Sequence, residues 1–203
     1  MTEAKRWILD RLGGRASAPK PSFRAKRVSP RGDKDSGALR REFSEALKAA
    51  GGAMVEMDSA DVQEIAKYFS GSVVVDTRRE PLDLPKHFEN VDLTILEGSF
   101  GVAENGAVWI EVPEWMPRGL LTLSHALALT LPADAIVPTM EDAYERLDLH
   151  ASTYGLFMAG PSKTADIEQS LVLGAHGAME LKVFIDQYGR KCTLEGDGVG
   201  RAF

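Results

Sequence analysis

The sequence predicts an α/β fold, a three-layer α/β/α arrangement built on a mainly parallel sheet. Two patterns lead to this prediction: helical and strand patterns alternate from residue 36 onward, and the strand runs are apolar on both faces. The composition is that of a globular protein, because 44% of the residues are hydrophobic and 27% are charged. The length of 203 residues favours one domain with irregular ends.

The first half of the alternation follows from apolar spacing and stop signals. Residues 36–50 carry apolar side chains at helical spacing and end at a Gly-Gly pair, and residues 53–57 then form a short strand. A second helix, capped by Asp58 or Ser59, precedes the β-branched run at residues 73–75. This segment therefore predicts helix, strand, helix and strand in that order.

The second half is richer in strands. Asn105-Gly106 is a strong two-residue turn signal, so it predicts a hairpin between residues 101–104 and 107–112. Thr139 with Asp142 three residues later predicts a capping box for a helix that ends near Leu149. Further strands of the same sheet are predicted at residues 91–96, 126–131, 135–137, 154–159 and 181–185.

The chain divides into three parts by composition. Residues 1–35 are predicted to be a basic N-terminal helix and linker, residues 36–188 an α/β domain, and residues 189–203 a Gly-rich C-terminal tail. Residues 1–41 hold twelve Lys or Arg and four Asp or Glu, a net charge of +8, which leaves −14 for the remainder. Because the basic arm has few interleaved aromatics, it favours a solvated or partner-docking role over nucleic-acid binding.

The sequence indicates a cytoplasmic protein without a membrane span. The most apolar stretch, residues 120–131, is interrupted by polar residues, and residues 1–15 lack the apolar segment of a secretory signal. A single cysteine, Cys192, cannot form an internal disulfide or hold an iron–sulfur cluster alone. Neither a cofactor nor a metal site is expected, since paired His and Cys ligands are lacking.

Glu104 is the first candidate for a chemical role. It follows an apolar strand, and strand ends with their loops form the ligand crevice of open α/β sheets. Its carboxylate could act as a general base, a nucleophile or an acceptor for a ligand hydroxyl, with Asn105 and Gly106 as ligand-binding neighbours. The structural alternative is a glutamate that accepts backbone N–H bonds within the Asn-Gly turn.

The second candidate segment runs from Ala159 to Glu168. Its Gly-Pro-Ser start predicts a helix N-terminus or a tight turn after a strand, where free N–H groups and a lysine could bind a phosphate or carboxylate. Many helices start in this way, so the pattern alone is a weak signal. The predicted ligand-binding residues here are Gly160, Ser162, Lys163, Thr164, Asp166 and Glu168.

The third candidate segment is Gly174-Ala175-His176-Gly177. Flanking glycines permit close approach of a ligand or of another strand, and His176 could exchange protons near neutral pH. A structural histidine that bonds a neighbouring turn explains the same residues. His176 is therefore a second candidate catalytic residue and Gly177 a ligand-binding one, and the three segments form one site only if the fold brings them together.

These segments, in this order, resemble the motifs of the lactate utilization protein C family, which carries the LUD domain. The family shows an Ala-Glu-Thr-Gly-like turn, a Gly-Pro-Ser-x-Thr-Ala-Asp-Ile-Glu segment and a Gly-x-His-Gly segment. The corresponding residues here are 103–106, 160–168 and 174–177, with Asn105 in place of the expected threonine. The resemblance spans roughly residues 38–186 and implies a fold similar to the NagB/RpiA/CoA-transferase-like group.

The resemblance also implies a function. It points to an accessory or ligand-binding subunit that supports oxidation of L-lactate to pyruvate beside iron–sulfur partner proteins, with a small anionic ligand and a homo-oligomeric state left open. The alternative is an enzyme resembling a CoA-transferase or a sugar-phosphate isomerase, because Glu-Asn-Gly looks like the turn that carries the catalytic glutamate in some CoA-transferases. Whether this chain is an enzyme on its own is left undecided.

Overall fold

The computed structural model describes residues 35–78, 84–85, 87–147, 154–165, 171–173 and 177–187. Of the predicted basic arm, only Asp35 falls within these ranges. The predicted tail at residues 189–203 lies outside them. In the part of the chain that the structure describes, no helix combines the length and the apolar character needed to cross a membrane.

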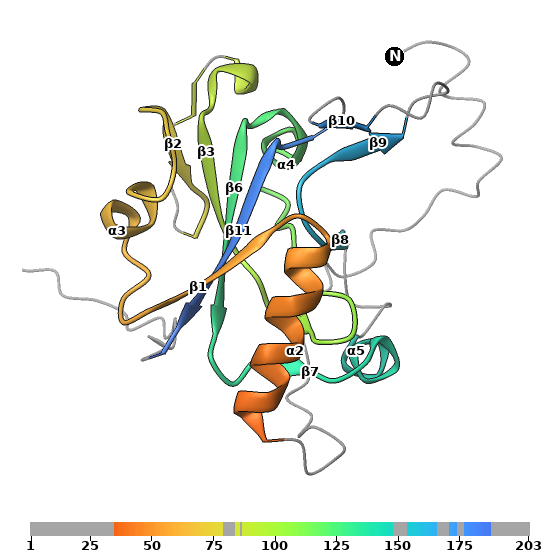
Figure 1. Ribbon diagram of the computed structural model, residues 1–203. Coiled ribbons are helices and arrows are strands. Elements are labelled where there is room, and N and C mark those ends of the chain that lie inside the picture. The colour runs from red at the N-terminus through yellow and green to blue at the C-terminus, as the bar shows by residue number, and fades with distance from the viewer. Residues whose placement is uncertain are drawn as a thin grey trace, which may run out of the picture.

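A five-stranded parallel sheet forms the centre of the molecule (Figure 1). Its order is β1-β11-β6-β3-β2, and every neighbouring pair runs parallel. The strands are β1 (Ala53–Met57), β2 (Val74–Asp76), β3 (Leu93–Glu97), β6 (Ala126–Pro132) and β11 (Glu180–Asp186). These ranges agree with the apolar runs in the sequence, which confirms the predicted α/β class and the parallel sheet.

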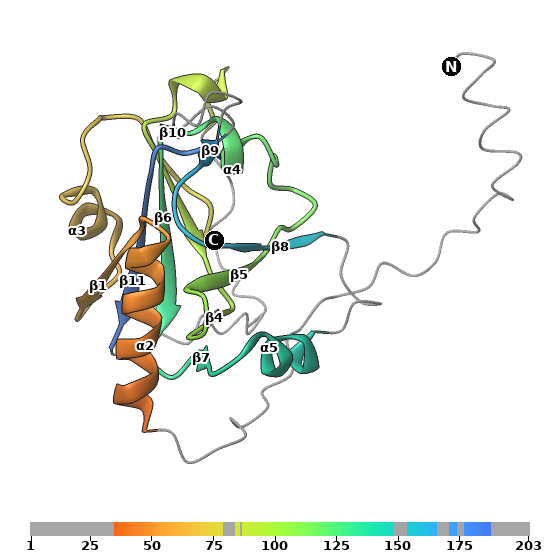
Figure 2. The same cartoon turned by 45° about the vertical axis from the view of Figure 1, so that its right-hand side comes forward.

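The two faces of this sheet are covered differently. Helix α3 (Val62–Ala66) packs on one face, where Ile65 meets Ile95 and Phe184 in a buried cluster. Helix α2 (Ser36–Ala49) packs on the opposite face through Leu39, Phe43 and Leu47. Figure 2 shows α3 on one side of the sheet and strands β4, β5, β7 and β8 on the other. Since side chains alternate along a strand, the strands contribute apolar side chains to the core on each face of the sheet.

A second, four-stranded sheet corrects the predicted topology. It has the order β7-β4-β5-β8 and comprises β4 (Phe100–Val102), β5 (Ala107–Glu111), β7 (Ile136–Val137) and β8 (Gly155–Met158). The hairpin around Asn105-Gly106 is confirmed, because β4 and β5 pair antiparallel. The prediction that residues 135–137 and 154–159 join the parallel sheet is wrong, because both strands belong to this second sheet. Apolar spacing predicts a strand but does not say which sheet it joins.

Helix ends show where local signals hold and where they fail. The capping box of Thr139 and Asp142 is present at α5 (Met140–Arg146), although the helix is shorter than predicted. Helix α3 starts after Asp61, so the expected cap at Asp58 or Ser59 is wrong; the Ser59 hydroxyl instead donates to the Asp61 carboxylate at 2.7 Å. The remaining elements are the 3-10 turn η1 (Phe88–Asn90), α4 (Leu120–Leu123), and the antiparallel strands β9 (Lys163–Ala165) and β10 (Leu171–Leu173).

Candidate functional site

The turn between β4 and β5 holds Glu104 by its carboxylate. Glu104 Oε2 accepts a hydrogen bond from the backbone N–H of Met140, the first residue of α5, at 2.8 Å. Asn105 Oδ1 closes the turn by accepting the N–H of Ala107 at 3.0 Å. The carboxylate thus accepts a backbone N–H, as the structural alternative proposed, but the donor belongs to α5 and not to the turn.

Two glycines from different motifs pack against the same helix. Gly106 has φ +70°, and a Cβ there would lie 2.4 Å from the backbone nitrogen of Leu47. Gly160 has φ +73°, and a Cβ there would lie 2.4 Å from the carbonyl oxygen of Ala50. Leu47 and Ala50 are about 4.5 Å apart along a helix axis. The fold therefore brings the first two motifs together over the C-terminal end of α2.

The segment after Gly160 does not start a helix, which is one of the two predicted alternatives beside a tight turn. Lys163–Ala165 is strand β9, and the Ser162 N–H is not free for an anion because it donates to the carbonyl of Ala178 at 2.8 Å. Lys163 lies over Gly51, where a Cβ would meet its Nζ at 2.7 Å. The ammonium group is thus next to the C-terminus of α2, the negative end of the helix dipole, which is a favourable place for a cation.

The third motif meets the second at Gly177. A Cβ on Gly177 would contact the Cβ of Ser162 at 3.1 Å, so these two backbones approach closely. His176, Asp166 and Glu168 lie outside the described residues, and Thr164 is described only by its backbone in β9. Gly106, Gly160, Gly177 and Ser162 therefore lie near the C-terminal end of α2 and the residues that lead into β11. The roles predicted for these residues in catalysis and ligand binding stay predictions.

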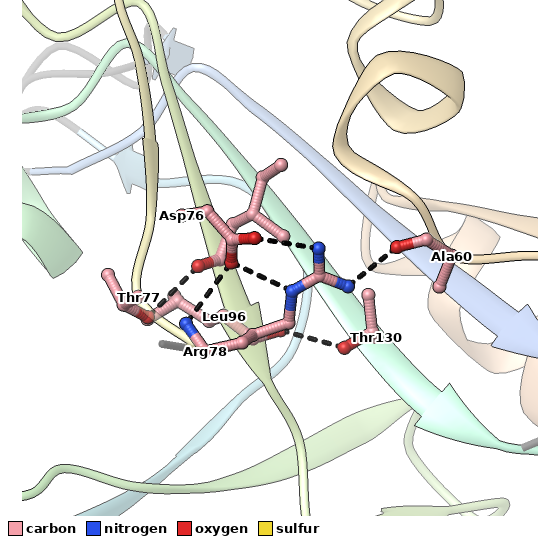
Figure 3. Close-up of polar contacts among 7 residues, drawn as sticks. Ala60, Asp76, Thr77, Arg78, Leu96 and Thr130 are labelled. Carbon is pink, nitrogen blue, oxygen red and sulfur yellow. Dashed lines mark hydrogen bonds and ion pairs between the residues drawn. The ribbon is translucent and has the colours of Figure 1, made fainter. Parts of the chain in front are cut away.

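A denser group of polar side chains lies elsewhere, at the carboxyl end of the parallel sheet (Figure 3). Arg78, just after β2, forms a two-point ion pair with Asp76, with Nε to Oδ1 at 2.8 Å and Nη2 to Oδ2 at 2.9 Å. Its Nη1 reaches the carbonyl oxygen of Ala60, before α3, at 2.7 Å. The Arg78 side chain is only 16% exposed. This pair thus ties the end of β2 to the loop that leads into α3.

Two more polar residues lie on the same face of the sheet. Glu97 on β3 pairs in register with Thr130 on β6, and alternation along both strands directs these side chains toward the α3 face. The Thr130 hydroxyl donates to the carbonyl of Leu96 at 3.3 Å, and the Glu97 side chain is exposed. We refer to Asp76, Arg78, Glu97 and Thr130 as the carboxyl-end cluster.

A half-buried carboxyl group lies beyond the end of β3. The Ser99 hydroxyl donates to Glu111 Oε1 at 3.0 Å. Burial raises the pKa of Glu111, and the charge of Glu97 raises it further, while hydrogen bonds from Ser99 and Trp109 act in the opposite direction. The Ser99 hydroxyl therefore links the segment that follows β3 to the end of β5.

Sequence reasoning missed this cluster although its signal was available. Asp76, Thr77 and Arg78 directly follow the apolar run at residues 73–75, and Glu97 directly follows the run at residues 91–96. Polar residues at the ends of parallel strands are the expected ligand contacts of an open α/β sheet. The same rule predicts a ligand contact at Glu104, but β4 belongs to the second sheet, so Glu104 does not lie at the carboxyl end of the parallel sheet. In the described ranges, no group of three or more His, Cys, Asp and Glu side chains could hold a metal ion.

The parallel sheet, covered on both faces, defines the chain as an α/β protein. The chain belongs to the LUD domain family, since the family model described as LUD domain matches residues 45–185. This match covers both sheets except the last residue of β11, and all of the carboxyl-end cluster. The resemblance noted from the three motifs is therefore confirmed.

Proteins and structures similar to the chain agree with this family. It is 27% identical over 154 residues to lactate utilization protein C of Anoxybacillus flavithermus, which is 62% of this chain and 70% of that protein. It is 30% identical over 95 residues to lactate utilization protein C of Halalkalibacterium halodurans, which is 44% of this chain but only 41% of that protein. A crystal structure of a DUF162 family protein from Deinococcus radiodurans matches with a TM-score of 0.57 at 14% identity, covering 76% of this chain and 99% of that one. This last likeness shows the fold.

Proposed function

We propose that this chain acts in lactate utilization, as an accessory or ligand-binding subunit that supports oxidation of L-lactate to pyruvate in the cytoplasm. The observation that carries the proposal is the LUD domain at residues 45–185, together with two relatives named lactate utilization protein C. The polar groups at the carboxyl end of the sheet are chemically suited to bind a small hydroxylated anion. They include a guanidinium group, a carboxylate and a hydroxyl group.

Iron–sulfur partner proteins complete the proposal. Oxidation of lactate to pyruvate removes two electrons, which an electron carrier has to accept. The 203 residues contain one cysteine, whereas a cluster of the common types takes four cysteine ligands. The electron-transfer step is therefore assigned to partners, and the ligand-binding step to this chain.

The test is a deletion of the gene in its source organism. Extracts of cells grown with L-lactate and a second carbon source are assayed for L-lactate-dependent reduction of an electron-accepting dye. We expect the deletion to remove most of this activity and a plasmid copy of the gene to restore it. Growth on pyruvate serves as the control, because a lesion before pyruvate leaves the use of pyruvate intact.

The purified chain gives the second half of the test. As an accessory subunit it should show no L-lactate-dependent dye reduction on its own, and it should restore activity when added to the deletion extract. Robust turnover by the purified chain alone would contradict an accessory role. Unchanged activity in the deletion extract would contradict a role in L-lactate oxidation altogether.

A further inference from the structure

The carboxyl-end cluster has hydrogen-bonding capacity that the described residues leave unused. A guanidinium group has five N–H donors. Arg78 donates three of them, two to the Asp76 carboxylate and one to the Ala60 carbonyl. The other two find no acceptor within the described ranges, although the side chain is only 16% exposed. A nearly buried guanidinium with further N–H groups can donate to an anion.

Asp76 makes Arg78 a rigid donor. The two-point contact fixes the plane of the guanidinium group, and the bond to Ala60 fixes its far end. Because a preorganised side chain loses little conformational entropy on binding, its remaining donors contribute more to affinity than those of a mobile arginine. Asp76 also balances the charge of Arg78, so an anion must gain most of its affinity from directed hydrogen bonds.

Glu97 supplies the complementary acceptor. It ends the neighbouring strand β3, its side chain is exposed, and alternation places it on the same face as Asp76. Arg78 forms its ion pair with Asp76 and not with Glu97. A carboxylate repels simple anions, but it accepts a hydrogen bond from a hydroxyl group. The cluster therefore favours an anion that carries a hydroxyl group beside its carboxylate.

We propose that the end of β2 and β3 binds a small 2-hydroxycarboxylate, with Arg78 holding the carboxylate and Glu97 accepting the hydroxyl hydrogen. Asp76 is a positioning residue that orients Arg78. The Thr130 hydroxyl, bonded to the Leu96 carbonyl, keeps the ends of β3 and β6 together beside the ligand. This assignment rests on the proposed role in lactate utilization, which makes L-lactate the probe of choice.

The experiment is calorimetric titration of the full chain at pH 7 and low ionic strength with L-lactate and, separately, with propionate. Propionate has the same carboxylate and carbon count but no hydroxyl group. We expect L-lactate to bind more tightly than propionate, because Glu97 recognises the hydroxyl. Equal affinity for the two anions, or heat no larger than dilution, would overturn the proposal.

Three variants locate the binding. Arg78→Lys keeps a positive charge but loses the planar group that Asp76 orients, so L-lactate should bind about tenfold more weakly or worse. Glu97→Ala removes the acceptor for the hydroxyl group at an exposed position. The loss of a negative charge changes the affinities for L-lactate and propionate alike, so the ratio of the two affinities should fall to about one. Arg41→Gln changes one exposed charge on α2 and is the control, with affinities like those of the wild type.

Circular dichroism reports whether Arg78→Lys folds. If it does not fold, the ratio of L-lactate to propionate affinity in Glu97→Ala still decides the test. A ratio that stays at the wild-type value overturns the assignment. Failure of the site and failure of the proposed function give different results. If the deletion extract loses L-lactate oxidation but titration shows no Glu97-dependent ratio, the site is wrong and the function stands. If the ratio depends on Glu97 but the deletion extract oxidises L-lactate normally, the function is wrong and the site stands.

Discussion

Replacing Gly106 with alanine tests whether the Glu-Asn-Gly turn is a structural contact. At φ +70° an L-residue costs about 1–2 kcal/mol relative to glycine. The new Cβ would also lie 2.4 Å from the Leu47 nitrogen and 2.5 Å from its Cα, so the turn or α2 must move. Overpacking of this kind typically costs about 1–3 kcal/mol. We therefore expect Gly106→Ala to lower the free energy of unfolding by roughly 2–5 kcal/mol.

The assay is thermal and urea unfolding followed by circular dichroism. For a chain of this size, each kcal/mol shifts the melting temperature by about 2–4 °C, so Tm should fall by at least about 4 °C. Gly37→Ala is the matched control, because Gly37 lies in α2, where the nearest atom to a new Cβ is the flexible Asp35 carboxylate at 3.2 Å. That variant should be neutral or up to about 0.5–1 kcal/mol more stable. A Gly106→Ala protein as stable as the control would refute the packing argument.

Three further predictions concern carboxylates. Because burial raises the pKa of Glu111, its protonated form stabilises the fold fully below its ordinary pKa of 4.5, and this contribution is lost as pH rises through the folded value. Glu111→Gln should thus match the wild type at low pH and exceed it at pH 7, by less than about 1 kcal/mol because the group is half exposed. Asp92 behaves oppositely, because the N–H groups of Val73 and Ser72 donate to its carboxylate and lower its pKa. Asp92→Asn should therefore be less stable than the wild type above the ordinary pKa of 3.8. Urea unfolding at a series of pH values should show this difference in stability vanish as the pH falls through the folded pKa. Glu104→Gln keeps an acceptor for the Met140 N–H, so Tm and the restoring activity in deletion extracts should stay unchanged; loss of activity with unchanged Tm would instead favour a catalytic role.

Local signals in the sequence were enough to predict most elements. The apolar run at residues 53–57 is β1, Asn105-Gly106 is the β4–β5 turn, and the Thr139 capping box starts α5. These features depend on residues a few positions apart, so the spacing of residue types in the sequence is enough to predict them. The parallel arrangement of the central sheet could also be predicted from the sequence, because strands without a polar face have to be covered by other elements on both sides.

Long-range placement could not be predicted in the same way. Residues 154–159 form a strand, yet pairing of β8 with β5 in a second sheet depends on contacts across more than forty residues. The Gly-Pro-Ser start predicts a helix or a tight turn, but Lys163–Ala165 pairs with Leu171–Leu173 as a strand, and the Ser162 N–H donates to the carbonyl of Ala178, just before β11. A Gly-Pro-Ser start is compatible with helix, turn or strand, and the partner backbone decides among them.

The motif segments and the carboxyl-end cluster carry different kinds of constraint. Gly106 and Gly160 are constrained by backbone geometry, because any Cβ would meet the backbone of α2. Arg78 is constrained by its side-chain bonds to Asp76 and Ala60, and Glu97 by its place at the end of β3. Substitution of the glycines should therefore change stability first, whereas Glu97→Ala, at an exposed position, should change ligand affinity at nearly constant Tm. If substitution of Gly106 or Gly160 instead lowers the affinity for L-lactate at constant Tm, the ligand binds near the end of α2. The carboxyl-end cluster then has the structural role of holding β2 to the loop before α3.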